Sequence, residues 1–392
     1  MRRNANTNLA MFVTPVDDMI TTVSIVKKVV RVVGEVCDEV YFVSGCLPES
    51  ESWPENCIIV DLGLKLHYVK SKTPYLLSMI SWIGKLAYLQ LRMALEVITR
   101  RKSIDIVFCY LGYHYQIPII IAKLLGKKVI SSATGITSDE VKQNYGDLIS
   151  KCITFIMDIS YYFSDAIIIQ SWRVAKHKSL SRWKNKMRMG ASYFGANEIF
   201  KPSVPITQRK DVIGYVGRFT QRKGVFELVT AFSMVLQKIP NTKLVLIGRG
   251  LVDVERKIKN LITELGMNNY VECLGQIPNN ELPEYYNEFK LLVIPSTSEG
   301  LPNVLLEAIN CNTPILSTPV GAIPDIVRDR ETGFLLENNE PGEIANRIVE
   351  ILMNQNYLEQ VVYKAREEVQ KNYSFKAAVN RYHALIGELC GN

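Results

Sequence analysis

The sequence has few of the residues from which most metal and redox sites are built. It contains four histidines and eight cysteines in 392 residues, and no two cysteines form a C-x-x-C pair. Zinc sites and disulfide frameworks need such clusters, so we expect reduced thiols, as in cytosolic proteins, and neither a disulfide framework nor a zinc site. The nearest acidic metal motif is Asp329-Arg330-Glu331, and a solvated turn explains it better.

Long apolar runs are also missing. The longest charge-free stretches, Ile106–Ala122 and Ala308–Pro324, have 17 residues each, and prolines and polar residues interrupt both. A membrane-spanning helix needs about 20 apolar residues. We see no secretory signal peptide either, so we expect a cytoplasmic protein.

The composition is that of a folded protein with an uneven charge. The chain is 47% hydrophobic and 22% charged, and its length suggests two or three domains of about 100–200 residues. The net charge is +7, but residues 1–200 carry +8 and residues 201–392 carry −1. The basic excess therefore belongs to the first half.

Short β-branched apolar runs alternate with longer helical patterns, which indicates parallel sheets wrapped by helices. We predict an α/β fold with two Rossmann-like doubly wound domains, residues 1–200 and 206–373, facing each other across a cleft. The proline-containing segment Lys201–Gln208 is the expected linker, and residues 374–392 form a helix that packs back on the first domain. The expected strands are Leu9–Thr14, Glu39–Ser44, Cys57–Asp61, Ile104–Tyr110, Lys128–Ser132, Ala166–Gln170, Val212–Gly217, Lys243–Ile247, Val271–Leu274, Leu291–Pro295, Pro314–Ser317 and Gly333–Leu336.

Three cations follow one of these strands. The strand ends at Gly217, a helix pattern begins at Val225, and Arg218, Arg222 and Lys223 lie between them. Basic side chains near a helix N-terminus favour an anion such as a diphosphate. A solvated basic loop is the alternative.

Two glutamates flank the start of a later helix. Glu299 lies in the polar loop before the helix, and Glu307 lies inside it among apolar residues. A carboxylate at that place is either exposed or paired with a polar group, and a ligand hydroxyl is one candidate. The alternative for Glu307 is a side chain that points to solvent. Gly248-Arg249-Gly250, after another strand, is either a tight turn or a close approach to a nucleotide.

Together these segments resemble the donor domain of the retaining glycosyltransferases of family 4, from about Ala191 to Leu352. Glu299 and Glu307 have the E-x7-E spacing of that family. The resemblance implies the two-domain GT-B fold and a nucleoside diphosphate sugar as donor, with no bound metal or other cofactor. The matching elements are Gly217-Arg218-Phe219, Lys223-Gly224, Leu246-Ile247-Gly248-Arg249-Gly250, Leu274-Gly275, Pro295-Ser296, Glu299-Gly300-Leu301-Pro302-Asn303, Glu307-Ala308, Thr318-Pro319-Val320-Gly321-Ala322 and Thr332-Gly333-Phe334-Leu335.

The resemblance also implies roles for individual residues. Arg218 and Lys223 would grip the donor diphosphate and stabilise the leaving group. Glu299 would lie near the donor sugar, as a nucleophile or as an orienting group, and Glu307 would bind the ribose hydroxyls. The other implied donor-binding residues are Gly217, Gly248, Gly300, Leu301 and Asn303. Gln276 and Ile277 would line the pocket for the nucleobase.

The first half resembles the family less closely. No glycine follows the first strand, and Thr134 stands where many members have a histidine. His114 is the other acceptor-side candidate, although a structural histidine beside two tyrosines is the simpler interpretation.

Two basic runs account for much of the positive charge. Residues 65–102 contain eight Lys or Arg and one acid, around a helix expected at Ser78–Thr99 with a wide apolar face. Such a helix favours an anionic membrane surface, and an ordinary packed helix is the alternative. Trp172–Arg188 has seven Lys or Arg and no acid, so anionic lipid, a lipid-linked pyrophosphate or RNA are open partners. Without a recognisable nucleic-acid module, we rank RNA last.

We therefore expect a hexosyltransferase-type enzyme that transfers sugar to a glycan or lipid-linked acceptor, peripherally at the cytosolic membrane face, in polysaccharide or glycoconjugate synthesis. Two alternatives stay open: a non-catalytic nucleotide-sugar-binding or scaffold subunit of a glycan-assembly complex, and a nucleotide-sugar epimerase.

Overall fold

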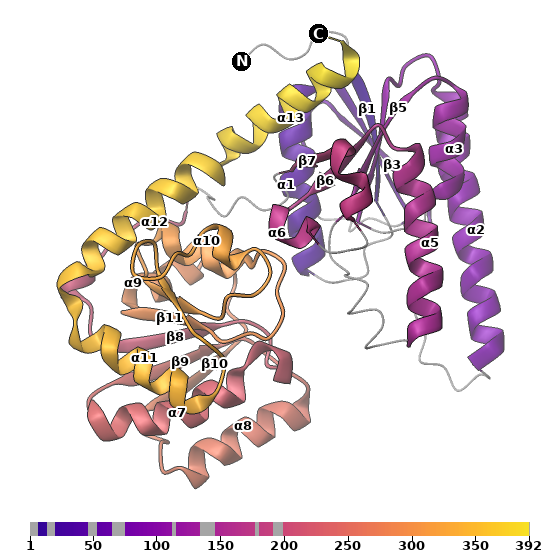
Figure 1. Cartoon of the computed structure of the whole chain (residues 1–392). Coiled ribbons are helices and arrows are strands. Elements are labelled where there is room, and N and C mark those ends of the chain that lie inside the picture. Colours follow the sequence, from indigo (N-terminus) through magenta and orange to yellow (C-terminus); the bar gives the residue numbers. More distant parts are fainter. Residues whose placement is uncertain are drawn as a thin grey trace. The chain divides into compact units, whose positions relative to one another are not determined.

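A computed structural model describes residues 7–13, 20–45, 53–64, 75–111, 115–133, 146–176, 180–190 and 199–391. The chain forms two compact units, Met1–Ser192 with Ala378–Asn392 and Tyr193–Ala377. Each unit contains one parallel sheet with helices packed against it (Figure 1).

The first sheet has seven strands in the order β3-β2-β1-β4-β5-β6-β7, all parallel. Its central strands are buried along almost their whole length, as expected for near-continuous apolar runs covered on both faces. The sequence did not predict β7, which is three residues long and carries Arg188 in its middle. The strands are β1 (Asn8–Val13), β2 (Glu39–Ser44), β3 (Cys57–Asp61), β4 (Ile106–Tyr110), β5 (Lys128–Ser132), β6 (Ala166–Ile169) and β7 (Met187–Met189).

Helices cover the first sheet on both sides, with α1 on one side and α2, α3 and α5 on the other (Figure 1). Leu89 and Met93 of α2 and Ile119 of α3 belong to the same apolar cluster as the sheet. The ring of Tyr382 in α13 lies 6.1 Å from that of Phe108, so the later part of α13 packs within this unit. The helical segments are α1 (Ile20–Val36), α2 (Tyr75–Thr99), α3 (Gln116–Leu124), α5 (Asp147–Phe163), α6 (Trp172–Ala175), the 3-10 turn η1 (Ser181–Lys186) and α13 (Phe375–Cys390).

The second sheet has six parallel strands in the order β10-β9-β8-β11-β12-β13. The strand order reverses between β8 and β11, and doubly wound sheets bind ligands outside the carboxyl ends of their strands at such a point. This edge therefore positions the candidate site. The strands are β8 (Val212–Val216), β9 (Lys243–Ile247), β10 (Val271–Gly275), β11 (Leu291–Ile294), β12 (Ile315–Ser317) and β13 (Phe334–Leu335).

Two apolar clusters sandwich the second sheet. One contains Leu228 of α7, Ile258 of α8 and Ile348 of α11, and the other contains Tyr286 of α9 and Leu305 of α10. The helical segments are η2 (Ile206–Gln208), η3 (Gln221–Lys223), α7 (Val225–Lys238), α8 (Val252–Glu264), α9 (Leu282–Glu288), α10 (Asn303–Asn310), η4 (Ile323–Asp325), α11 (Pro341–Met353), η5 (Gln355–Tyr357) and α12 (Leu358–Asn372).

The segment Lys201–Gln208 is not the linker that its prolines suggested. The chain passes from one unit to the other at Ser192 and Tyr193, and residues 201–208 lie inside the second unit. Ile206 is buried, and the Ser203 amide donates a hydrogen bond to Asn287 Oδ1 at 2.7 Å. The prolines here lie in a segment that packs within the second unit, not in a linker between the units.

The cysteines of the described residues form no disulfide. Seven of them are free, and Cys37 and Cys109 lie in the core of the first unit. Burial raises the pKa of both thiols, so they behave as small apolar side chains.

Candidate functional site

The loops after β8, β9 and β10 are bound to one another by main-chain groups. The Gly217 amide donates to the Ile247 carbonyl at 2.9 Å, and the Gly248 amide donates to the Gly275 carbonyl at 2.7 Å. Gly248 has a φ of +141°, and a Cβ there would lie 1.8 Å from the Gly217 carbonyl oxygen. Only glycine fits, so Gly217 and Gly248 meet at the carboxyl edge of the sheet.

The loop with the three cations packs against the loop after β11. Gly224 adopts a left-handed conformation with a φ of +69°, and a Cβ there would lie 2.1 Å from the Pro295 carbonyl oxygen. The Thr297 amide donates to the Arg222 carbonyl at 2.9 Å. These close contacts bring Lys223 next to Glu299, although 76 residues separate them in the sequence.

Glu299 accepts two hydrogen bonds at one carboxylate oxygen. Lys223 Nζ lies 2.6 Å from Glu299 Oε1, and the buried Ser296 hydroxyl donates to the same oxygen at 2.8 Å. The side chains of Lys223 and Glu299 are only 21% and 9% exposed, so solvent screens their attraction less than at an open surface. The structure thus joins two of the three predicted catalytic residues in one ion pair.

The third, Arg218, lies one residue after Gly217. Its side chain is exposed and makes no ion pair or hydrogen bond with the residues that the structure describes. Its carbonyl accepts a hydrogen bond from the Tyr215 hydroxyl at 2.9 Å, which fixes the main chain. Burial, with smaller effects of Glu299 and Glu227, raises the pKa of Tyr215, so the phenol remains a donor. The guanidinium is therefore available to an anion from solvent.

Glu307 does not point to solvent. The residue is 4% exposed, and its Oε2 accepts a hydrogen bond from the Tyr286 hydroxyl of α9 at 3.0 Å. Its Oε1 lies 3.4 Å from Asn279 Nδ2, in the loop after β10. The sequence allowed either a solvent-exposed carboxylate or one paired with a polar group. The structure shows the paired carboxylate, and the partner of Oε2 is Tyr286.

The remaining predicted donor-site residues lie on the same edge in different environments. Gln276 is exposed, whereas Ile277 is half-buried and packs on the apolar cluster with α9 and α10. The Gly300 carbonyl accepts from the Ala322 amide at 2.8 Å. Leu301 is buried in the core, so only its main chain can face a ligand. Asn303 begins α10, and its buried Oδ1 has no hydrogen-bond partner among the described residues.

The sequence analysis did not single out Tyr286 or Asn279, and it gave Ser296 no role although Pro295-Ser296 is one of the matching elements. Ser296 stands beside a predicted strand end, so its position was a usable signal. Tyr286 precedes Glu307 by 21 residues on another helix, and nothing in that spacing indicates a contact.

The acceptor-side candidates His114 and Thr134 lie outside the described residues. In the basic run Trp172–Arg188, local partners occupy several cations. Arg182 pairs with Asp158, Lys186 donates to the carbonyls of Tyr161 and Tyr162, and Arg188 pairs with Glu388. Arg182 and Arg188 therefore have carboxylate partners within the chain, whereas Lys186 keeps its positive charge, and an anionic partner for this run stays a prediction.

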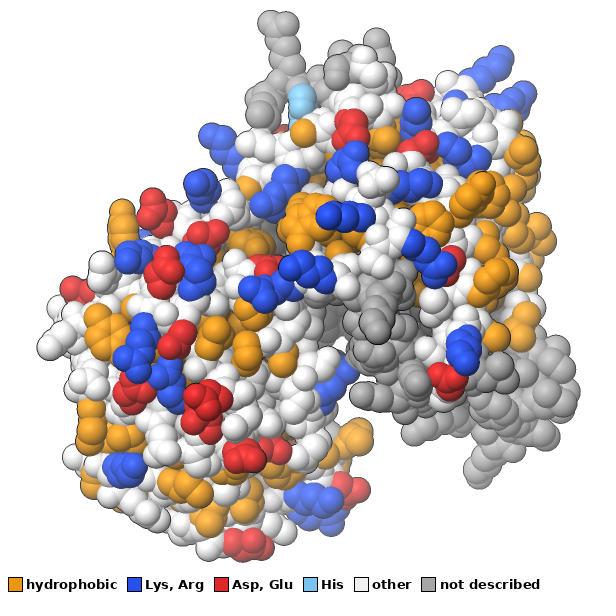
Figure 2. Space-filling view, viewed as in Figure 1, with side chains coloured by type: hydrophobic (Ala, Val, Ile, Leu, Met, Phe, Trp, Pro, Cys, Tyr) orange, Lys and Arg blue, Asp and Glu red, His pale blue; other side chains and the backbone are white. Residues whose placement is uncertain are grey.

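One side of helix α2 exposes apolar side chains. Leu89, Met93 and Val97 are buried against the sheet, whereas Leu91 is 58% exposed and Ile83, Leu95 and Ile98 are exposed as well. Leu124 of the neighbouring α3 is 77% exposed. Hydrophobic side chains gather along this flank in Figure 2. Within the part of the chain that the structure describes, no helix is long and apolar enough to cross a membrane.

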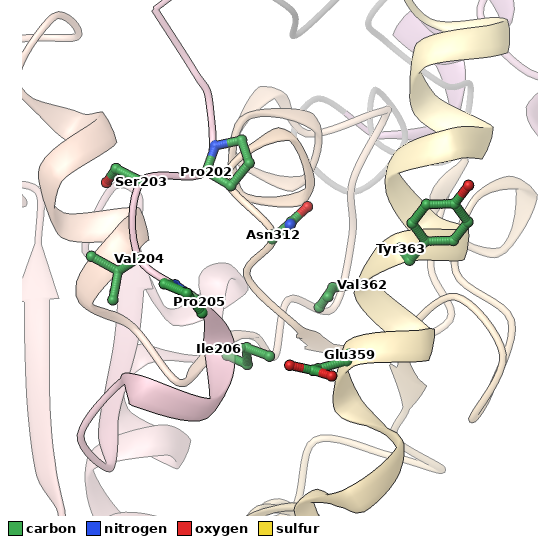
Figure 3. Close-up of a pocket in the computed structure, with 9 residues that line it drawn as sticks. All are labelled: Pro202, Ser203, Val204, Pro205, Ile206, Asn312, Glu359, Val362 and Tyr363. Atoms are coloured by element: carbon green, nitrogen blue, oxygen red, sulfur yellow. The ribbon is translucent and has the colours of Figure 1, made fainter.

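A cavity of about 370 Å³ lies elsewhere in the second unit (Figure 3). Its walls come from the segments before β8 and β12 and from α12, so it faces the amino ends of the strands. None of the predicted site residues lines it. The lining residues are Pro202, Ser203, Val204, Pro205, Ile206, Asn312, Glu359, Val362 and Tyr363.

Residues 196–368 match the family model "Glycosyl transferases group 1". The match covers most of the second unit and less than half of the chain. Over 170 residues, 42% of each chain, the protein is 32% identical to the capsular polysaccharide biosynthesis glycosyltransferase CapM of Staphylococcus aureus. It is 23% identical over 360 residues, 88% of each chain, to the N-acetyl-alpha-D-glucosaminyl L-malate synthase of Bacillus anthracis. Apart from that synthase, the chain spans about half the length of the curated relatives it matches.

Solved structures resemble the fold over the whole chain. HepE of Anabaena in complex with UDP has a TM-score of 0.75 at 16% identity, with 97% of this chain and 100% of that one covered. Sucrose-phosphate synthase of Thermosynechococcus elongatus has a TM-score of 0.71 at 19% identity, with 98% and 99% covered. The predicted α/β class with two Rossmann-like parallel sheets, the GT-B fold, is confirmed.

Proposed function

We propose that this chain is a retaining glycosyltransferase that needs no bound metal ion. It transfers a sugar from a nucleoside diphosphate sugar to a glycan or a lipid-linked acceptor. The observation that carries the proposal is the ion pair of Lys223 with Glu299 at the carboxyl edge of the second sheet, the edge at which Arg218 follows β8 and doubly wound folds bind nucleotides. The group 1 family match over the same residues supports it.

In this proposal the diphosphate binds to Arg218 and Lys223. Arg218 has no ion pair among the described residues, and the Lys223 ammonium has three N–H donors, so it can bind a phosphate oxygen while it keeps its bond to Glu299. Two fixed cations stabilise the negative charge that grows on the leaving diphosphate, and this effect is strong where water is excluded. They supply the counter-charge that a metal ion supplies elsewhere.

Glu299 lies beside the donor sugar in this proposal. Its carboxylate accepts bonds from Lys223 and Ser296, and the Glu299 carbonyl lies so near Gly321 that only glycine fits there. A carboxylate fixed in this way can orient sugar hydroxyls and stabilise positive charge at the anomeric carbon. The Anabaena HepE structures with UDP and with UDP-glucose support a nucleotide sugar as the ligand of this fold.

The main experiment compares wild type with Arg218→Ala in transfer from a panel of nucleoside diphosphate sugars to a lipid-linked acceptor. Removing one group that stabilises transition-state charge is expected to lower turnover about 100- to 1,000-fold. Arg256→Ala is the matched control, because Arg256 is an exposed arginine of α8 that pairs with Asp253. A folded Arg218→Ala protein with undiminished transfer would sink the assignment.

Two further measurements on wild type test the retaining mechanism and the independence from a metal ion. The anomeric configuration of the product, read by NMR, must equal that of the donor, and inversion would contradict the retaining mechanism. Turnover must survive an excess of chelator, and its loss would contradict metal independence. The absence of both donor hydrolysis and transfer by the purified chain alone would favour a non-catalytic subunit that needs a partner chain.

We also propose that the enzyme works peripherally at the cytosolic face of a membrane and docks through α2 and α3. The exposed Leu91, Leu95 and Leu124 provide apolar contact, and the nearby exposed Lys85, Arg101 and Lys102 attract anionic headgroups. Glu96, the one acid of α2, pairs with Arg100, so it does not repel such a surface.

Co-flotation with vesicles of mixed neutral and anionic lipid tests this docking. The double variant Leu91→Glu/Leu95→Glu should float at least tenfold less than wild type, because two carboxylates must be desolvated at the interface. Met353→Glu, an exposed apolar site of the second unit, should float like wild type. Equal flotation of all three proteins would exclude docking through α2.

A further inference from the structure

Glu307 has a fixed orientation because of a neighbour on another helix. Its Oε2 accepts from the Tyr286 hydroxyl at 3.0 Å, and both residues are buried. A buried carboxylate oxygen that lost this donor would keep its desolvation cost without compensation. The hydrogen bond therefore sets which way the carboxylate turns.

Tyr286 is itself held firmly. Its ring contacts those of Phe200 and Phe289, at centroid distances of 5.9 and 6.2 Å. Its carbonyl accepts hydrogen bonds from the buried Arg209 Nη1 at 3.0 Å and from Thr313 Oγ1 at 2.5 Å. Burial, and then the charge of Glu307, raise the pKa of Tyr286 well above 10, so the phenol keeps its proton and remains a donor.

This arrangement distinguishes the two oxygens of the carboxylate. Oε2 faces the buried tyrosine, whereas Oε1 faces Asn279 in the exposed loop after β10. A ligand at the carboxyl edge thus meets an acceptor, Oε1, next to an amide that can both donate and accept. Two adjacent hydroxyls match that pair, one donating to Oε1 and the other bonding to the amide.

We propose that Tyr286 is a positioning residue for donor recognition: its hydrogen bond to Oε2 turns the Glu307 carboxylate so that Oε1 lies toward Asn279, in the orientation that binds the ribose hydroxyls. The inference rests on the proposed function and on the role that the family resemblance implies for Glu307, which is to bind the ribose hydroxyls. It makes the site selective for ribonucleoside diphosphates over analogues without the two hydroxyls. Tyr286 acts only through Glu307.

Calorimetric titration with UDP and with 2′,3′-dideoxy-UDP tests this, with the ADP and GDP pairs run in parallel. In wild type the ribonucleotide should bind about tenfold or more tightly than its dideoxy analogue, as expected for hydrogen bonds to a charged group. Tyr286→Phe should reduce that ratio severalfold and leave dideoxy binding unchanged. Tyr285→Phe, the same change at the half-buried neighbour in α9, should preserve the ratio.

A double variant separates positioning from folding. In a Glu307→Gln background, Tyr286→Phe should have little further effect on the ratio, because the group it positions has changed. A purely structural tyrosine would weaken both ligands equally and leave the ratio intact, which would overturn the inference while wild type still binds. Wild type that binds none of the nucleotides would overturn the proposed function, and this inference with it.

Discussion

The two units contain the same kind of sheet but use their charged residues differently. In the second unit, which has almost no net charge, Arg218 stays without an ion pair among the described residues and Lys223 pairs with Glu299 at the strand ends. In the strongly basic first unit, Arg182 and Arg188 pair with carboxylates of their own unit. Net charge therefore says little about where an anion binds, because folding can neutralise a basic run locally.

Two described glycines with positive φ, one in each unit, have different surroundings. Gly248 of the second unit lies against another loop, whereas Gly126 of the first unit, before β5, has open space around its Cα. Both have positive φ values, +141° and +74°. At the candidate site a glycine with positive φ also packs against a neighbouring loop. A positive φ without such a contact, as at Gly126, does not indicate a site.

The largest expected effect is that of Gly248→Ala. The new methyl group would overlap the Gly217 carbonyl, so we expect a loss of about 3 kcal/mol or more in the free energy of unfolding. Gly126→Ala, with conformational strain but no overlap, should lose only about 1 kcal/mol. Urea unfolding measures both, and equal losses would mean that the loop contact does not matter.

A second contrast lies within helix α2. Leu89→Ala removes a buried side chain and should cost about 2–5 kcal/mol, whereas Leu91→Ala on the exposed side should stay within about 0.5 kcal/mol. Thermal and urea unfolding of the pair test whether α2 has one packed and one open side. A large loss for Leu91→Ala would show that this side is covered.

The smallest effect is expected for Arg188→Ala, which breaks the exposed pair with Glu388. We expect at most about 1 kcal/mol, and less at high salt. The hydrogen bond from Arg188 lowers the pKa of Glu388 below 4.5, so its stabilisation is present at neutral pH and disappears as pH falls through the lowered value. The difference between the unfolding curves of wild type and variant should therefore be larger at pH 7 than at pH 3. A loss of the same size at pH 3 would assign the effect to packing.

The strands were largely predictable because their signal is local. Glu39–Ser44 and Lys243–Ile247 have the bounds that their apolar runs indicate, and strand ends differ by a residue where Gly217 or Pro295 follows. The sequence missed Met187–Met189, because three residues with an arginine between two methionines carry no strand pattern. It also misjudged Lys201–Gln208, since prolines that bend a packed segment look like those of a linker.

The sequence alone therefore determined the α/β class, the order of the donor-site segments and the residue types at the strand ends, because periodicity and turn chemistry act over a few residues. Tertiary structure decided which of these side chains meet. Lys223 reaches Glu299 only because two loops touch at Gly224, and Glu307 turns toward Tyr286 only because two helices cover the same face of the sheet. Such contacts depend on how separate elements pack, and their sequence separations carry no signal of it.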